Sequence, residues 1–471
     1  MTTVTNTPQP ARCGATRLRP YQSDGIAAIT ASLARGQRPL YVLPTGGGKT
    51  VAFVHLARNY PGRVCILMHR GELIEQTSRA LGDTPHGIIQ AGRAPRPHAR
   101  IQIASVQTLV NRLAAYSFDL IIVDEAHHTT AKSYRSIIAA YSHAALLGVT
   151  ATPCRTDGTG LSDAGFDSLI LGPSVAELTA QGYLTPAQVY APHGGVDTSK
   201  LHSKYGDYVK KELSELMSKP SITGDAIAHY RRFADGQPAI AFCVSVERAE
   251  ATAEMFRAQG YSAASIDGKK TPIERRQLIR ALAAGTLNVL TSCDLISEGV
   301  DVPVVSCGIM LRPTQSLALW LQQIGRCLRP APGKTHAVIL DHVGNSLRHG
   351  MPESVREWSL YGAPVCRVQR DADDAPARCC LQCYRTHEPR PVCPFCGFVY
   401  PARPREIAEV SGELALLDAQ WDAVKAVPVG RMEEWQCKSL ADYQALAEER
   451  GYKPGWAFVR WNAKQKQRAS A

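Results

Sequence analysis

The chain has 471 residues, 45% of them hydrophobic, and carries a net charge of +11. This length excludes a single ordinary domain, and about three folding units with well-packed cores are expected. No run of about 18 apolar residues is present, which excludes an ordinary membrane-spanning helix, so we expect no membrane partner. The excess of Lys and Arg suits a polyanionic partner but does not prove one.

The N-terminal end is polar. Residues 1–16 are rich in Pro and Thr and contain no apolar core, so we expect a disordered segment and no signal peptide. Residues 17–160 are expected to form a first α/β domain, because apolar strand-like runs within them lead into helical patterns.

A glycine-rich turn follows the strand-like run at 40–43 and precedes the helical pattern at 51–59. Glycines let the backbone curl so that successive N–H groups point at phosphate oxygens, and the helix N-terminus adds its positive dipole end. Lys49 is then expected on the β- and γ-phosphates and the Thr50 hydroxyl on Mg²⁺. A plain turn is the alternative, but it leaves the Lys-Thr pair unexplained. The sequence predicts an ATP-binding loop made of Thr45, Gly46, Gly47, Gly48, Lys49 and Thr50.

A second buried strand is expected at 119–124, ending in an acidic residue. Parallel strands deliver such residues to the carboxyl edge of a sheet. We predict that Asp124 binds Mg²⁺ and that Glu125, one residue on, addresses the attacking water. An ordinary acidic strand end explains Asp124 alone, but not the four residues from Asp124 to His127.

Residues 161–221 are expected to connect two halves of the chain. Their charged, helix-like stretch at 204–219 suits either a nucleic-acid-contacting insertion or a solvated face, and we favour the solvated face. Residues 222–365 repeat the α/β pattern without a phosphate loop, which predicts a second parallel sheet. We expect strands at 239–244, 287–290, 306–311 and 337–340, and helices at 247–259, 272–284 and 316–328.

The last of these helices carries two arginines. Arg326 and Arg329 are three residues apart, so both side chains are expected on one helix face. Guanidinium groups can stabilise the charge that develops on a transferring phosphoryl group. Helical arginines are usually solvated, but the preceding Gln322 and Gly325 favour a catalytic interpretation of this pair.

Two Cys-x₂-Cys pairs lie nine residues apart in the segment 376–400. Four thiolates so spaced can close a tetrahedral site, which predicts a zinc ribbon that depends on Zn²⁺ to fold. Cys379 is a spare candidate and His387 a weaker one, while an iron–sulfur cluster fits this compact spacing less well. The other nine of the 14 cysteines are scattered, so we expect no disulfide framework and a reducing, cytoplasmic location. The predicted Zn²⁺ ligands are Cys380, Cys383, Cys393 and Cys396.

Residues 405–471 have helical periodicity, notably at 411–425 and 439–450. From residue 451 onward, five Lys or Arg residues and no acidic residue accompany Trp456, Phe458 and Trp461. This pattern suits an auxiliary nucleic-acid contact, through phosphate neutralisation and base stacking. It suits equally a small packed helical domain with a cationic tail.

Over roughly residues 17–345, the motifs resemble those of superfamily 2 DEAD/DEAH-box helicases of the DExH type. The resemblance rests on short segments in the family's order. Besides the phosphate loop and Asp124-Glu-Ala-His127, they are Arg19-Pro-Tyr-Gln22, His69-Arg-Gly-Glu-Leu73, Ser105-Val-Gln-Thr108, Thr150-Ala-Thr-Pro153, Ser265-Ile-Asp-Gly268 with Glu274-Arg275, Thr291 to Asp301, and Gln322 to Arg329.

The resemblance implies two RecA-like domains in tandem, with the nucleotide in the cleft between them. It places Gln22 on the adenine, and Gly299 and Asp301 at the nucleotide. It assigns the arginine-finger motif to residues 322–329, in which Gln323 stands where the family commonly has arginine. The segments 69–73, 105–108 and 265–275 are implied to hold the backbone of a nucleic acid.

The loop Thr45–Thr50 and the segments Leu18–Gln22 and Pro173–Pro186 resemble the branch that holds repair translocases, branch-migration helicases and restriction-enzyme motor subunits. The short two-domain form with a cysteine cluster behind it also resembles helicases carried by phages and prophages. That branch mostly acts on duplex or branched DNA, so we expect DNA as the partner. The expected activity is ATP hydrolysis coupled to movement along a strand. The alternatives are a remodelling translocase without strand separation, an RNA helicase, and a zinc-bearing nucleic-acid adaptor with an inactive motor.

Overall fold

The computed structural model describes residues 18–155, 158–191, 196–204, 206–217, 220–293, 304–362, 376–401, 437, 439–449, 455–458 and 460–461. The chain divides into two compact units, Met1–Pro401 and Ala402–Ala471. The expectations of disorder at 1–16 and of a helix at 411–425 lie outside the described residues.

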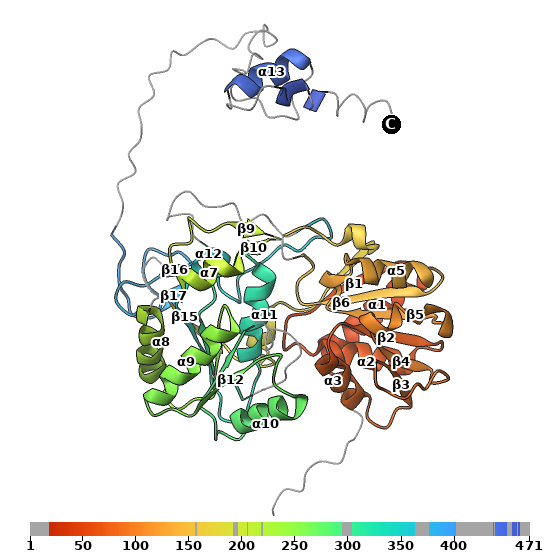
Figure 1. The fold of residues 1–471 in the computed structure, drawn as a ribbon, viewed down its shortest axis with the longest axis horizontal. Helices are drawn as coiled ribbons and strands as arrows, with labels where there is room; N and C mark the ends of the chain where they lie inside the picture. The colour runs from red at the N-terminus through yellow and green to blue at the C-terminus, as the bar shows by residue number, and fades with distance from the viewer. Residues whose placement is uncertain are drawn as a thin grey trace, which may run out of the picture. The chain divides into compact units, whose positions relative to one another are not determined.

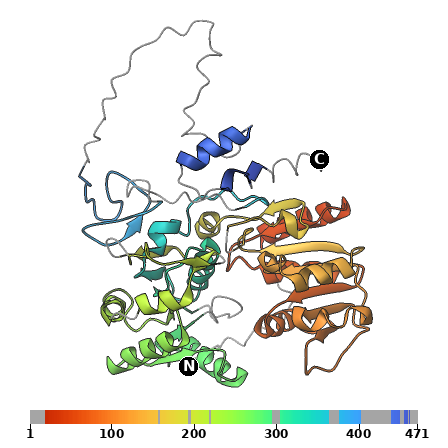
Figure 2. The same ribbon diagram turned by 45° about the horizontal axis from the view of Figure 1, so that its top comes forward.

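The first domain is built on a seven-stranded parallel sheet in the order β3-β4-β2-β5-β6-β1-β7 (Figures 1 and 2). Every residue of β1, β2, β4 and β5 is buried, as expected for central strands covered on both faces. The strands are β1 (Pro39–Val42), β2 (Val64–Met68), β3 (His86–Ile89), β4 (Ile101–Ser105), β5 (Leu120–Asp124), β6 (Ala145–Thr150) and β7 (Ser168–Leu171). The helices are α1 (Pro20–Ala34), α2 (Lys49–Asn59), α3 (Gly71–Leu81), α4 (Val106–Leu109) and α5 (Lys132–Ala140), with short 3₁₀ turns at Leu113–Ala115, Ala126–His128 and Ser162–Ala164.

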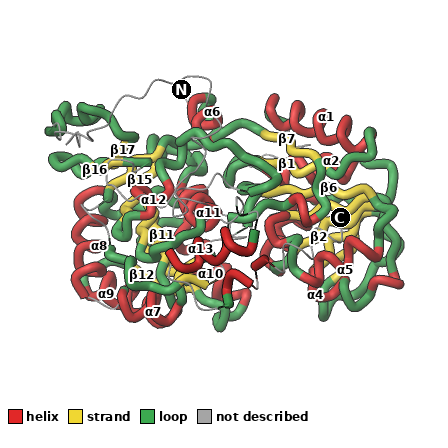
Figure 3. The backbone as a smooth tube through the Cα atoms, turned by 90° about the horizontal axis from the view of Figure 1, so that it is seen from above, coloured by secondary structure: helices red, strands yellow, loops and turns green. Residues whose placement is uncertain are grey.

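The second domain contains a six-stranded parallel sheet in the order β12-β13-β11-β14-β15-β8. Its strands are β8 (Ala187–Tyr190), β11 (Ala239–Phe242), β12 (Ala263–Ile266), β13 (Val289–Ser292), β14 (Cys307–Met310) and β15 (Ala337–Asp341). Its helices are α8 (Pro220–Phe233), α9 (Val246–Ala258), α10 (Pro272–Ala283), α11 (Leu317–Cys327) and α12 (Asn345–His349), and Figure 3 shows them in red around the yellow strands. The predicted class, two parallel-sheet RecA-like domains in tandem, is confirmed.

The segment 161–221 contributes to both sheets. Strand β7 pairs with β1 at one edge of the first sheet, and β8 pairs with β15 at one edge of the second. Between these strands lies α6 (Val175–Ala180), which begins with a capping box in which Ser174 and Glu177 bond each other's backbone N–H groups. The connection expected from the sequence therefore also supplies an edge strand to each domain.

The charged stretch at 204–219 is not one continuous helix. It begins in a two-stranded hairpin of β9 (Ser203–Lys204) and β10 (Asp207–Tyr208), followed by the short helix α7 (Lys210–Leu216). Asp207 accepts hydrogen bonds from Arg312 and from the backbone N–H of Gln315, at 3.2 and 2.9 Å. The expectation of a purely solvated face is wrong at Asp207, because this side chain anchors the hairpin to the segment that follows β14.

After α12, residues 352–362 return to the first domain, and we call them the interdomain strap. Arg356 fixes the start of the strap to the second domain by donating hydrogen bonds to the backbone carbonyls of His349 and Met351. It also donates to the carbonyls of Pro352 and Ser354 within the strap. At the other end, the carbonyl of Leu360 accepts from the N–H groups of Leu161 and Ser162, at 2.7 and 3.0 Å. Trp358 and Leu360 pack against the core of the first domain.

Residues 376–401 form a small cysteine module with the antiparallel strands β16 (Arg378–Cys379) and β17 (Thr386–His387). The module lies against the edge strand β8 of the second domain, because Arg385 forms an antiparallel bridge with Tyr190. The N–H of Ala191 also donates to the carbonyl of Tyr384, at 3.4 Å. The module thus covers an edge of the second sheet that is otherwise left open to pairing.

The second compact unit contains α13 (Leu440–Glu449), within the helix expected at 439–450. Tyr443 and Leu446 of this helix are buried in a small cluster with Cys437 and Ala457, against which Trp456 and Trp461 pack. These two tryptophans therefore contribute to a packed core. Among the described residues, no helix is both long and apolar enough to cross a membrane.

Candidate functional site

The phosphate loop lies between β1 and α2, at the carboxyl edge of the first sheet. Gly46 and Gly48 have φ values of +89° and +87°, a left-handed conformation that L side chains rarely adopt. A Cβ atom on Gly48 would also lie 2.4 Å from Nε2 of Gln22. The loop therefore needs glycine at both positions, and its backbone forms the concave turn that phosphate oxygens fit.

Gln22 contacts this loop from the first turn of α1. Its Nε2 atom donates to the carbonyls of Gly47 and Gly48 at 3.4 and 3.5 Å, and its Oε1 atom accepts from the N–H of Arg19 at 3.0 Å. The hydroxyl of Tyr21 donates to the same Gly47 carbonyl, at 2.7 Å. The segment expected to read the adenine thus lies directly against the phosphate loop.

Two adjacent carboxyl groups end β5. Asp124 and Glu125 are only 5% and 7% exposed, and burial, together with the charge of Glu125, raises the pKa of Asp124 to about 7. Oε2 of Glu125 is buried and accepts no hydrogen bond. Two adjacent buried carboxyl groups, one with an oxygen that accepts no hydrogen bond, form the donor set that a hard divalent cation such as Mg²⁺ prefers.

Glu125 has an unusual backbone conformation, with φ at +50°. Non-glycine residues held in this region concentrate at functional sites. The turn directs His127 back toward β6, where its Nδ1 atom lies 3.2 Å from Oγ1 of Thr150 and 3.5 Å from Oε2 of Glu125. His127 therefore connects the carboxylate to the segment 150–153.

Lys49 lies within electrostatic reach of residues from both domains. Burial lowers its pKa, the charges of Glu125 and Asp124 raise it, and those of Arg326 and Arg329 lower it. The two arginines belong to the second domain, so the structure brings them to the phosphate loop as the sequence led us to expect. Burial also lowers the pKa of Arg329 to about 10, so that it remains charged at neutral pH.

One detail of that expectation is wrong. Helix α11 ends at Cys327, with Leu328 as its C-cap, so Arg329 does not extend from the same helix face as Arg326. It reaches the loop from the turn after the helix, where a Cβ on Gly46 would lie 3.5 Å from Cγ of Arg329. At Gly325, a Cβ would lie 2.5 Å from Cβ of Thr45, so the helix needs a glycine to approach the loop this closely.

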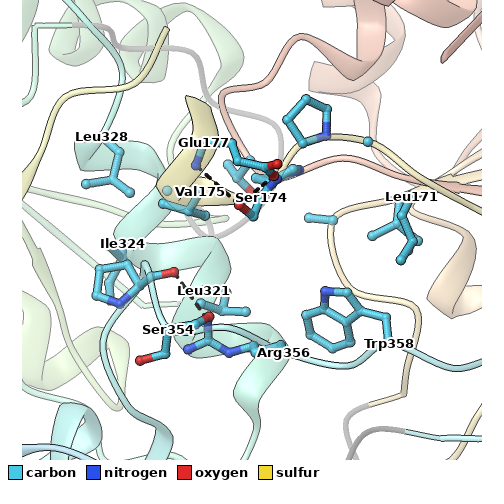
Figure 4. Close-up of a pocket in the computed structure, with 18 residues that line it drawn as sticks. Leu171, Ser174, Val175, Glu177, Leu321, Ile324, Leu328, Ser354, Arg356 and Trp358 are labelled. Carbon is cyan, nitrogen blue, oxygen red and sulfur yellow. Dashed lines mark hydrogen bonds between the residues drawn. The ribbon is translucent and has the colours of Figure 1, made fainter. Parts of the chain in front are cut away.

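Beside the loop lies a cavity of about 300 Å³ that sequence reasoning missed (Figure 4). Leu321, Ile324 and Leu328 of the second domain line one side, Ser174 and Leu171 lie opposite, and Trp358 of the strap closes it. No local pattern pointed to Trp358, because its position depends on the return of the strap to the first domain. Gly299 and Asp301, implied at the nucleotide, lie outside the described residues.

The segments implied to hold nucleic acid meet across the two domains. Arg275 of α10 donates to Oε1 of Glu72 in α3, at 2.5 Å, and this ion pair joins the two RecA-like domains. The Nε atom of Arg275 is buried and has no hydrogen-bond partner. Arg275 is therefore a cation among the segments implied to hold nucleic acid, and its Nε–H is an unused hydrogen-bond donor.

In the cysteine module, the thiols of Cys380, Cys383, Cys393 and Cys396 all lie within 4.8 Å of one another. The two spare candidates are engaged elsewhere. The thiol of Cys379 donates to the carbonyl of Ala191 at 2.8 Å, and the ring nitrogens of His387 contact the Glu388 carbonyl and the Tyr400 hydroxyl. The four clustered sulfurs are a donor set that fits a tetrahedral metal ion.

Comparisons with known proteins agree with this geometry. The family model described as "Type III restriction enzyme, res subunit" matches residues 15–155, and that described as "Helicase conserved C-terminal domain" matches residues 219–331. A "51.5 kDa protein" of a Lactococcus phage is 34% identical over 383 residues, covering 80% of this chain and 82% of that protein. The "Putative ATP-dependent helicase IRC3" of Saccharomyces cerevisiae is 32% identical, covering 70% of this chain but only 52% of its own length.

A solved structure is similar in fold. A fragment of a putative HsdR subunit of a type I restriction enzyme from Vibrio vulnificus aligns with a TM-score of 0.54 and 22% identity, over 71% of this chain and 67% of that one. The likeness in structure supports the fold. The chain belongs to the superfamily 2 helicases of the DExH type. It is accordingly a nucleic-acid-dependent ATPase, with ATP as the nucleotide and Mg²⁺ as the usual metal ion of the family.

Proposed function

We propose that this chain is a motor that moves along DNA, with duplex or branched DNA as its preferred substrate, and that it separates strands as it moves. The observation that supports the motor is the placement of Arg326 and Arg329 within electrostatic reach of Lys49, because these groups come from opposite domains. The phosphoryl charge is then stabilised fully only when both domains contribute. Hydrolysis is thereby linked to domain closure.

The proposed roles combine the geometry of the described residues with the resemblance to the family. The Lys49 ammonium binds phosphate oxygens, Glu125 orients the attacking water, and Arg326 and Arg329 stabilise the charge that develops on the γ-phosphoryl group. Thr50 and Asp124 hold Mg²⁺, which neutralises phosphate charge when bound. Gln22, the loop residues Thr45 to Gly48, and Gly299 with Asp301 complete the proposed nucleotide site. Nucleic acid lies across both domains and is held mostly through its backbone, so little sequence preference is expected.

The preference for DNA rests on relatives. A "DNA 3'-5' translocase XPB2" of Sulfurisphaera tokodaii is 23% identical over 356 residues. A type ISP restriction-modification enzyme solved "bound to DNA" aligns with a TM-score of 0.53 and 16% identity, over 69% of this chain and 27% of that one. ATP hydrolysis measured with single-stranded, duplex, forked and four-way DNA and RNA tests the proposal. Stimulation of hydrolysis by forked or four-way DNA is expected, and stronger stimulation by RNA rejects the DNA assignment. A forked duplex that remains paired in an unwinding assay with ATP rejects strand separation.

We also propose that the cysteine module is a zinc ribbon that holds one Zn²⁺ through its four clustered thiolates, with a structural role. Zinc content measured after Cys383→Ser and Cys396→Ser tests this proposal. Cys379→Ser is the matched control, because Cys379 is adjacent to Cys380 in the sequence but its thiol donates a hydrogen bond to the Ala191 carbonyl. One zinc per wild-type chain, retained in the control and lost in the two other variants, is expected. Equal zinc content in all four proteins rejects the site.

A further inference from the structure

A second cavity, of about 260 Å³, lies between the second RecA-like domain and the cysteine module. Three aromatic rings, two histidines and one arginine define its character: Tyr190, Phe233, Tyr384, His229, His342 and Arg232. Tyr384 comes from the module, and the other five come from β8, from the last turn of α8 and from the residue after β15. The docked module therefore supplies part of the cavity wall through Tyr384.

The walls of the cavity offer planar groups for stacking. The rings of Tyr190 and Phe233 stack on each other at 4.2 Å with an interplanar angle of 23°, and those of His229 and His342 stack at 5.2 Å and 22°. The Arg232 guanidinium lies 5.0 Å from the centre of the Phe233 ring and supplies a positive charge at the rim. Flat apolar surfaces beside one cation suit a flat ligand that carries a negative charge.

His342 adds a neutral, largely buried ring to the wall of the cavity. The side chain is 7% exposed, and its Nε2 atom is buried without a hydrogen-bond partner. Burial and the neighbouring His229 lower its pKa to about 3, so the ring is neutral and offers one donor and one acceptor nitrogen. The carboxylate of the neighbouring Asp341 already accepts hydrogen bonds from the backbone N–H groups of Val343, Asn345 and Ser346 and from the Ser346 hydroxyl.

Tyr384 stands at a position that favours glycine. It directly follows Cys383 and has a φ of +60°, one of two described non-glycine residues with positive φ. In the second Cys-x₂-Cys pair, the equivalent position after Cys396 is Gly397, with a φ of +74°. The first pair thus retains a tyrosine where the local backbone favours glycine, and that tyrosine lines the cavity. Side chains kept in such a conformation concentrate at ligand sites.

We propose that this cavity binds a single unstacked nucleotide. The base lies against Tyr384 and the Tyr190–Phe233 pair, and its phosphate lies near Arg232. The volume is just below the usual range of about 300–1,000 Å³ for small-molecule sites, so it suits one nucleotide and not two. The proposal extends the proposed function, because it gives the nucleic-acid track a pocket that holds a base.

The position of the cavity favours a nucleotide of the bound strand over a free one. Tyr190 ends β8, and His342 directly follows β15. All strands of this sheet are parallel, so their carboxyl ends lie at one edge. The segments implied to grip nucleic acid, at 265–268 and from 291 onward, follow β12 and β13 at that same edge. Parallel α/β sheets bind their ligands along this edge.

The decisive variant is Tyr384→Gly, which removes the ring and places glycine where the backbone favours it, so that misfolding does not account for a loss. Binding of a single-stranded oligodeoxynucleotide is measured without ATP, beside an abasic strand of the same length, on zinc-loaded full-length protein. We expect about 5- to 150-fold weaker binding of the base-bearing strand, the loss typical of one stacked base. The abasic strand is expected to bind the variant and the wild type alike. Phe395→Gly is the control, because it removes an exposed ring of the same module outside the cavity.

Two further measurements distinguish the phosphate contact from the base contact, and a nucleotide of a bound strand from a free nucleotide. Arg232→Gln is expected to reduce by about one the slope of log affinity against log salt, as for one lost phosphate contact, whereas Tyr384→Gly leaves that slope unchanged. Titration with AMP and TMP tests free nucleotides. Loss of binding in Tyr384→Gly, either of the oligodeoxynucleotide or of a free nucleotide, supports the site. Equal binding by wild type and Tyr384→Gly overturns it. A wild-type chain that binds no nucleic acid instead rejects the proposed function itself.

Discussion

Nδ1 of His127 lies 3.2 Å from Oγ1 of Thr150, and the same nitrogen is 3.5 Å from Oε2 of Glu125. Oγ1 of Thr150 in turn donates to the carbonyl of Thr152, at 2.9 Å. One buried imidazole therefore connects the carboxylate proposed to orient water with the segment at the end of β6. A change at either end can reach the other through this contact.

His127→Ala is expected to uncouple hydrolysis from nucleic acid. Basal ATP hydrolysis should remain within a few fold of wild type, while stimulation by DNA should fall by about 5- to 150-fold, the usual range of a coupling between two sites. The measurement is ATP turnover with and without saturating DNA. Thr150→Val should give the same loss, and the double variant should lose no more than either single variant. Additive losses would show that the two residues act separately.

Glu72→Gln is expected to strengthen nucleic-acid binding. The change removes an anion that occupies Arg275 across the domains, and so frees a guanidinium for phosphate. Partly exposed pairs contribute about 0.2–1 kcal/mol, so affinity at low salt should rise by no more than about fivefold. Glu75→Gln is the matched control, because Glu75 lies one turn further along α3 and pairs with Arg93 of its own domain. The same gain in both variants would mean that only net charge matters.

Gly160→Ala is expected to detach the interdomain strap. A Cβ at this position would lie 2.0 Å from the carbonyl oxygen of Leu360, which accepts the hydrogen bonds of Leu161 and Ser162. Hydrogen exchange at those two amides should accelerate, and the unfolding free energy of the first domain should fall by about 1–3 kcal/mol for two lost bonds. Gly268→Ala is the control, because nothing lies within 4 Å of its added Cβ. Unchanged exchange in Gly160→Ala would show that the strap is not held at this point.

Each element that was predicted from the sequence is a local pattern, either a short apolar run or a helical period. These elements are the strands β1, β5, β11, β13, β14 and β15 and the helices α2, α9, α10 and α11. The strands β7 and β8 escaped prediction because they lie in the segment 161–221, which was expected to be only a connection, and each pairs with a strand far away in the sequence. The strap was equally hidden, since its contact between Gly160 and Leu360 joins residues 200 positions apart.

The residues proposed for the motor could be selected from the sequence because their spacing reflects chemistry. Lys49, Asp124 and Arg326 lie in motifs whose residue types suit phosphate, metal and charge stabilisation. The turn that brings in Arg329 was not predictable, because it depends on where α11 ends. The cavity proposed to bind a nucleotide was not predictable either, because Tyr384 reaches it only when the cysteine module docks on β8.

Acid is expected to destabilise the second domain through His349. Burial is the main cause that lowers its pKa from 6.5 to about 4; Arg348 and Arg356 lower it further, and the Thr314 carbonyl and Asp207 oppose them. The unfolded chain then binds more protons below pH 6.5, so the stability present above that pH is lost as the pH falls toward 4. The loss is about 1.4 kcal/mol per pH unit. Thermal melting measured between pH 7 and pH 4 records it.

His349→Gln retains a donor for the Thr314 carbonyl but does not titrate, so its melting temperature should fall less steeply with acid. His143→Gln, at an exposed position, serves as the control and should follow wild type. Parallel curves for all three proteins would show that His349 does not cause the acid sensitivity.

The most direct test of the motor is a comparison of ATP binding and ATP turnover in Arg326→Ala and Lys49→Ala, each in the presence of DNA. An arginine that acts from the opposite domain on the transition state contributes about 10³-fold or more to turnover. Arg326→Ala should therefore bind ATP as tightly as wild type and hydrolyse it at least about 10³-fold more slowly, whereas Lys49→Ala should abolish hydrolysis. Arg326→Ala with wild-type turnover, or with a loss of ATP binding as large as its loss of turnover, would contradict the account.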